Sequence, residues 1–121
     1  MLRLVSCLWG MLCSLQMSNY IFEKVMIAAS KRILYLPHAI QQMLRPDRMI
    51  FREEIEKAIF HGEVIEDYPE DPRGHSCLIC YGEPPNRPIH VVCSPKVEYL
   101  VIITTYFPDP AEWSPDFKRR L

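Results

Sequence analysis

The most regular pattern of apolar and polar positions runs over residues 51–60 and has the period of a helix. The apolar residues of one face are Phe51, Ile55, Ala58 and Ile59. Glu53 and Glu54 fall in the first turn, where the helix dipole favours negative charge. Gly62 follows, and glycine commonly ends helices. We therefore predict a helix over this stretch.

The segments before this helix have weaker patterns. Residues 1–30 form an N-terminal extension that we expect to be helical or partly disordered, and residues 31–36 alternate as a short strand. Pro37 suits the first turn of a helix, because that position needs no backbone N–H. This helix ends before Pro46, since a proline disfavours the α conformation in the residue that precedes it. The rest of the chain, residues 31–121, is predicted to form a single domain.

After Gly62 the pattern changes from the period of a helix to that of strands. Four further strands are predicted, over residues 64–68, 76–81, 89–93 and 99–106. Their short connections, rich in Pro, Gly and Asn, favour antiparallel pairing over helical crossovers. The expected fold class is α+β, with N-terminal helices packed on a curved, mostly antiparallel sheet of four to five strands. Residues 108–121 follow as a polar tail that contains Trp113.

Composition narrows the functional classes. A length of 121 residues suits one core, and a net charge of −1 gives no overall attraction to RNA or to a membrane surface. Five cysteines cannot all pair with one another, which favours a reducing compartment, and we expect a cytoplasmic protein. The apolar run of residues 4–15 is too short to span a bilayer, and no signal-peptide cleavage pattern follows it. We therefore expect no membrane association.

Several short blocks resemble those of a known family. They occur in its order and spacing from about Ile33 to Trp113: PHAIQQM, REEIEKAIFHGEVIEDYPED, SCLICYG, RPIHVV and IITTYFPDPAEW. The string is similar to the family called domain of unknown function 4258. This resemblance implies a RelE-like fold, shared with barnase and colicin-type ribonucleases, and a toxin-like, metal-independent endoribonuclease of a bacterial toxin–antitoxin system. It further implies RNA as substrate, a cognate antitoxin protein as partner, and no cofactor. The chain departs from the family pattern at Gln42, where an Arg is common.

Cleavage of RNA without a metal requires three groups. A base takes the 2′-OH proton, an acid protonates the leaving 5′-oxygen, and a cation or donor stabilises the phosphate. His38 begins a predicted helix, whose positive dipole end favours neutral imidazole and hence the role of base. His90, on a predicted strand, is the second acid–base candidate. In the alternative structural interpretation, His38 only caps a helix and His90 only forms a hydrogen bond across the sheet.

Phosphate contact is assigned to arginines, because guanidinium matches phosphate with two hydrogen bonds. Arg48 is the candidate for the catalytic contact, and Tyr106, at the end of the last predicted strand, is the candidate for stacking on a base or donating to the phosphate. Arg45, Arg87 and Thr105 are candidates for binding the substrate. The alternatives are solvated surface arginines and a tyrosine at the edge of the core.

Two other functions remain open. A non-enzymatic binding module of the same fold would scatter these polar side chains over different faces, whereas a nuclease would gather them on one concave face. A weaker alternative is a zinc-stabilised interaction domain that uses four residues: His75, Cys77, Cys80 and Cys93. Cys77 and Cys80 would face opposite sides of a straight strand, so we assign no metal site.

Overall fold

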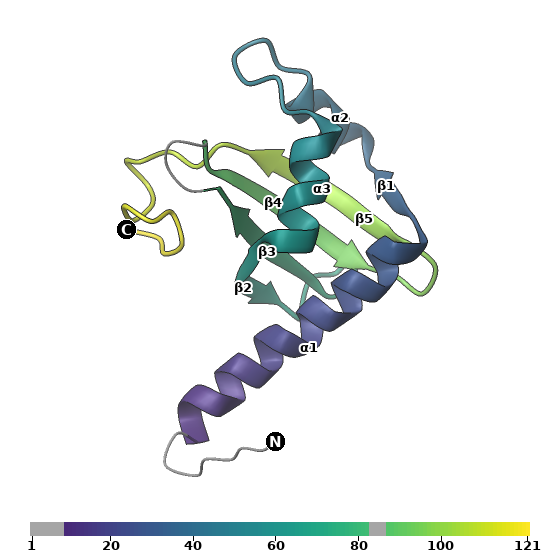
Figure 1. Ribbon diagram of the computed structural model, residues 1–121, viewed down its shortest axis with the longest axis vertical. Helices are drawn as coiled ribbons and strands as arrows, with labels where there is room; N and C mark the ends of the chain where they lie inside the picture. Colours follow the sequence, from purple (N-terminus) through teal and green to yellow (C-terminus); the bar gives the residue numbers. More distant parts are fainter. Residues whose placement is uncertain (1–8, 83–86) are drawn as a thin grey trace.

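The structure is a computed structural model that describes residues 9–82 and 87–121, with side chains from residue 20 onward. Within these ranges it contains three helices and five strands (Figure 1). In chain order they are α1 (Trp9–Lys31), β1 (Ile33–Tyr35), α2 (Pro37–Met43), α3 (Arg52–His61), β2 (Glu63–Tyr68), β3 (Ser76–Tyr81), β4 (Ile89–Pro95) and β5 (Leu100–Tyr106). Residues 1–8 of the predicted N-terminal extension lie outside the described residues.

The strands form one sheet in the order β1-β5-β4-β3-β2. β1 runs parallel to β5, and all other neighbouring strands are antiparallel. The parallel pair is possible because two helices and three strands separate β1 from β5 along the chain. The predicted α+β class with a mostly antiparallel sheet is therefore confirmed, while the likeness to RelE stays a prediction.

Local chemistry determines where α2 and α3 begin. Pro37 occupies the first turn of α2. At the start of α3, the N–H of Phe51 donates to the side chain of Glu54 over 3.0 Å, which satisfies a donor near the helix end. Phe51 is the cap of α3, outside its first turn, and its side chain is 57% exposed instead of joining the buried face.

The helices cover one face of the sheet, which we call the helix face (Figure 1). Residues of the helices and of the strands together form the core on this face. The helices contribute Ile21, Val25, Ala28, Ala39, Met43, Ile55, Ala58 and Ile59, and the strands contribute Cys77, Ile79, Val91, Cys93 and Ile102. The last turns of α1 thus share a core with the sheet. In the described part of the chain, no helix has the length and apolarity needed to cross a membrane.

The opposite face of the sheet is covered without a helix. It carries the residues that alternate with those of the helix face, among them Leu78, Cys80 and His90. Residues 108–121 fold back over it, and Trp113 in this segment is only 3% exposed. The expected polar tail is therefore part of the fold, and its Trp113 is buried.

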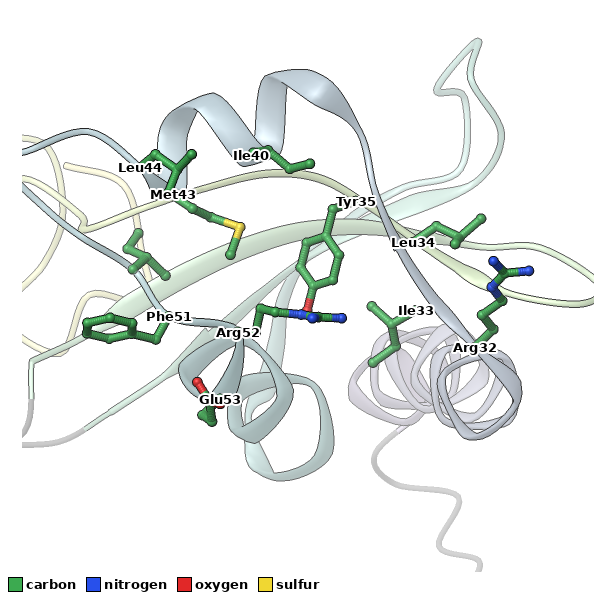
Figure 2. A pocket seen from close by; sticks show the side chains of 11 residues that line it. Arg32, Ile33, Leu34, Tyr35, Ile40, Met43, Leu44, Phe51, Arg52 and Glu53 are labelled. Carbon is green, nitrogen blue, oxygen red and sulfur yellow. The ribbon is translucent and has the colours of Figure 1, made fainter.

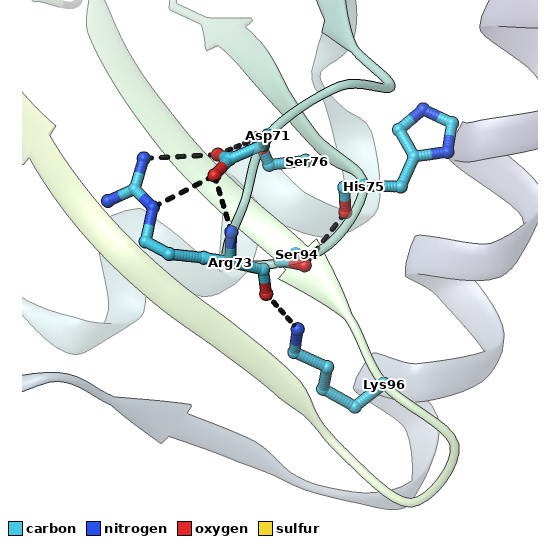
Figure 3. Close-up of polar contacts among 6 residues, drawn as sticks. All are labelled: Asp71, Arg73, His75, Ser76, Ser94 and Lys96. Atoms are coloured by element: carbon cyan, nitrogen blue, oxygen red, sulfur yellow. Dashed lines mark hydrogen bonds and ion pairs between the residues drawn. The ribbon is translucent and has the colours of Figure 1, made fainter.

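The connection between β2 and β3 lies against the end of β4 on this face (Figure 3). Ser94 donates to the backbone oxygen of His75, and Ser76 donates to Asp71, both over 2.7 Å. Arg73 binds the same carboxylate through its guanidinium, and these hydrogen bonds hold the pKa of Asp71 well below its usual range. A connection with charged and turn-forming residues thus has defined contacts with the sheet.

Gly62 follows α3 at a position where no larger residue fits beside the sheet. Its φ of −82° is open to any residue, so the constraint is steric. A Cβ at this position would lie 2.4 Å from the Ala58 oxygen and 2.7 Å from a methyl carbon of Ile79.

We expect Gly62→Ala to lower the free energy of unfolding by about 1–3 kcal/mol, as overpacking does. Urea unfolding measures this loss. The matched control is Glu56→Ala on the exposed side of α3, expected to stay within about 0.5 kcal/mol of wild type; equal stability of both variants would contradict the prediction.

Candidate functional site

His90 on β4 is fully buried, at 0% exposure. Its Nε2 lies 2.8 Å from the backbone oxygen of Phe117. A carbonyl oxygen only accepts, so Nε2 carries the proton. In the neutral ring Nδ1 then accepts from the Tyr106 hydroxyl, 3.3 Å away. Both ring nitrogens therefore have partners inside the protein.

Residues of the C-terminal segment surround the His90 ring. Trp113 meets it edge to face with ring centroids 4.5 Å apart. The guanidinium of Arg120 lies 4.7 Å from the centroid of the Trp113 ring. Arg120 also donates twice to the carboxylate of Glu66 on β2, over 2.8 and 3.1 Å. These contacts fasten the segment to the sheet over His90.

The surroundings keep the His90–Tyr106 pair neutral. Burial lowers the pKa of His90 below its ordinary value, and the bond to the Phe117 carbonyl offsets this only in part. Burial also raises the pKa of Tyr106. A general acid or base must reach its substrate, and a ring with no exposed surface has no such access. This geometry fits the structural interpretation of His90.

The other predicted site residues lie on and around α2, whose residues divide into three sides. Ala39 and Met43 face the core, as their burial shows. Helical spacing places His38 and Gln42 on one flank and Ile40 and Leu44 on the other. His38 is exposed at the start of the helix. One flank of α2 is thus polar and the other apolar.

Arg48 attaches to the polar flank of α2. Its Nη1 donates to the Gln42 side chain over 2.8 Å and lies 3.4 Å from the Thr105 backbone oxygen. Gln42, where the chain departs from the family pattern, therefore binds Arg48 in this structure. An Arg at that position would repel Arg48, whereas the Gln42 oxygen accepts from it.

The remaining candidates already have partners. Arg45 forms a two-bond pair with Asp47, with both bonds at 3.1 Å. Arg87 binds Glu54 over 2.9 and 2.6 Å and also donates to two backbone oxygens of the α2–α3 connection. The buried Thr105 hydroxyl donates to the His90 backbone oxygen over 2.9 Å. The contacts of Arg87 and Thr105 join separate elements of the fold, and Arg45 and Arg87 each lie beside a carboxylate.

The structure therefore divides the predicted site residues into two groups. His90 and Tyr106 come together on the face covered by the C-terminal segment. His38 and Arg48 lie with α2 on the helix side, and Thr105 joins that side because it pairs with Val91. The sheet separates the two histidines.

The four residues of the zinc alternative do not converge on one point. Across the described side chains, residues 20–82 and 87–121, no three His, Cys, Asp or Glu groups converge as metal ligands. Cys77 and Cys93 are neighbours in the core, with their sulfur atoms 4.0 Å apart. Cys80 is on the opposite face, where burial raises its pKa to about 11. His75 bonds to Asp67 over 2.5 Å.

A groove of about 810 Å³ lies between β1, α2 and the start of α3, and we call it the β1 groove (Figure 2). Three of its apolar residues are exposed: Ile40 at 44%, Leu44 at 63% and Phe51 at 57%. Arg32, Arg52 and Glu53 are its charged lining residues. Apolar side chains gathered at exposed positions mark surfaces that bind partners.

The β1 groove was not predicted from the sequence, although the sequence contains a signal for it. Ile40 and Leu44 are apolar residues four apart, next to the buried pair Ala39 and Met43. The apolar side of α2 is therefore wider than one contact surface requires. Excess width of this kind indicates a second surface beside the core.

Comparison with known proteins defines the class of this chain. The family model described as "Domain of unknown function (DUF4258)" matches residues 35–107, and the chain belongs to this family. No curated protein and no solved structure matches the chain. All of α1 and the C-terminal segment over His90 lie outside the matched residues.

The burial of His90 predicts a specific dependence of stability on pH. Its pKa is lower in the folded chain than in the unfolded chain, where it is about 6.5. The unfolded state therefore binds more protons as the pH falls below that value, and stability is lost. We expect wild type to lose more unfolding free energy between about pH 7.5 and about pH 5 than His90→Gln, whose amide donates without titrating.

Urea unfolding of both proteins at the two pH values measures this difference. The variant serves as the control for the carboxylates that titrate in the same interval, because both proteins share them. Equal losses in the two proteins would show that His90 titrates alike in the folded and unfolded chain, and would contradict the buried, neutral ring.

Proposed function

We propose that this chain is a binding module that docks a protein partner in the β1 groove and does not cleave RNA. The main observation in support of this proposal is the separation of the candidate catalytic residues. His90 is fully buried with both ring nitrogens bonded, and the sheet lies between it and His38. An acid and a base on opposite faces cannot act on one phosphate.

The electrostatics support binding of protein over RNA. Four arginines of the described residues lie beside a carboxylate within 3.1 Å and are therefore not free cations: Arg45 with Asp47, Arg73 with Asp71, Arg87 with Glu54 and Arg120 with Glu66. A nucleic-acid site needs cations that are free to displace counterions from phosphates. The net charge of −1 adds no general attraction.

A second candidate is the toxin-like, metal-independent endoribonuclease expected from the resemblance, with a cognate antitoxin as partner. One contact favours it. Arg48 donates to Gln42 on the flank of α2 that also carries His38, and it has no carboxylate partner among the described ion pairs. This candidate would use His38 and Arg48 without His90.

Induced expression in bacteria separates the two candidates. We expect wild type to leave growth and total RNA intact, as does the double variant His38→Ala, Arg48→Ala at equal soluble abundance. The purified protein should also leave a labelled RNA uncut, with an active ribonuclease as positive control. Wild type that arrests growth and cuts RNA, beside a harmless double variant, would overturn the binding proposal and support the nuclease.

A further inference from the structure

The outer edge of β1 has backbone groups with no partner in the described chain. Leu36 donates to the Ile102 oxygen over 3.1 Å, and Leu100 donates to the Arg32 oxygen over 2.8 Å. A parallel strand bonds its neighbour through every second residue. The backbone groups of Ile33 and Tyr35 therefore point away from β5, along the free edge of the sheet.

The β1 groove runs beside this free edge. Figure 2 shows Tyr35 between the apolar flank of α2 and the start of α3, with Ile33 further along the same strand. Its lining includes Ile40, Leu44 and Phe51, which leave large exposed surfaces. A strand added at the edge would place every second side chain toward one face of the sheet. The groove offers an apolar surface for those side chains.

The charges at the groove select the partner. Arg32 and Arg52 are exposed, and neither forms an ion pair with a described residue. The Arg52 guanidinium lies 5.5 Å from the centroid of the Tyr35 ring. The Tyr35 hydroxyl is buried, so it is not open to a ligand. The lining of the groove thus carries two cations against one carboxylate, Glu53, and this balance favours an acidic ligand.

We propose that the β1 groove binds an extended segment of a partner protein, with apolar residues at alternate positions and a flanking Asp or Glu, as a sixth strand beside β1. The proposal rests on the binding function above and adds the form and chemistry of the ligand. Backbone hydrogen bonds to Ile33 and Tyr35 supply affinity, and the groove and arginines supply selectivity. The segment needs about five residues, because β1 is short.

A defined peptide tests this proposal. The probe is a fluorescent peptide of about eight residues that alternates Val with Thr and ends in two Glu. Its controls carry Lys in place of Glu, or N-methyl groups on alternate residues that remove the donors facing β1. We expect each control peptide to bind about ten-fold or more weakly in fluorescence anisotropy. We also expect the Ile33 and Tyr35 amide signals to shift when the acidic probe is added.

Two matched protein variants locate the site. Leu44→Glu places a charge in the groove, and Val97→Glu makes the same change at a residue that is 79% exposed in the β4–β5 turn. We expect about ten-fold weaker binding for the first variant and unchanged binding for the second. The strand-addition proposal is overturned if the acidic probe does not bind. It is also overturned if Leu44→Glu or N-methylation of the peptide leaves the affinity unchanged.

The result also shows which proposal has failed. If the acidic peptide does not bind and RNA stays intact, the ligand assignment is overturned and the binding function remains. RNA cleavage that disappears in the His38→Ala, Arg48→Ala variant overturns the binding function itself. Self-association of wild type in sedimentation that Leu44→Glu abolishes would assign the groove to a second copy of the chain and overturn the peptide ligand.

Discussion

The central strands of this sheet must be covered on both faces, and the rest of the structure depends on that requirement. In β3 the consecutive residues Cys77, Leu78 and Ile79 are all fully buried, although their side chains alternate between the faces. The helices bury one face through the core that includes Ile55 and Ile59. The C-terminal segment and the β2–β3 connection bury the other. Large apolar side chains are worth about 1.5–3 kcal/mol each when buried, so neither cover is dispensable.

This requirement also decides which polar side chains remain available for function. His90 lies under the C-terminal segment, where the Phe117 carbonyl and the Trp113 ring hold it. A buried histidine with both nitrogens bonded stabilises a cover and keeps its site closed. The exposed features lie on the far side of the sheet instead, with α2 and the free edge of β1. The proposed partner site therefore follows from the parts of the fold that the two covers leave open.

Sequence patterns predicted the elements well because those elements have local causes. The bounds of β3 were predicted as Ser76–Tyr81, and α3 differs from its prediction by a single residue at each end. The position of the C-terminal segment has no local cause. Residues 108–121 are mostly polar, and their fold depends on contacts of Trp113 and Arg120 with residues far away in the chain. The dispersal of the site residues was hidden for the same reason, since it depends on which face each strand residue occupies.

The most direct test of this account is an NMR measurement of the His90 imidazole. The spectrum to record is a long-range ¹H–¹⁵N correlation of the ring, combined with nuclear Overhauser contacts to the indole of Trp113. The account predicts a neutral ring protonated at Nε2 near pH 7, with clear contacts to that indole. A ring in rapid exchange between tautomers, without contacts to Trp113, would contradict it, because His90 would then be open to solvent and free to take part in catalysis.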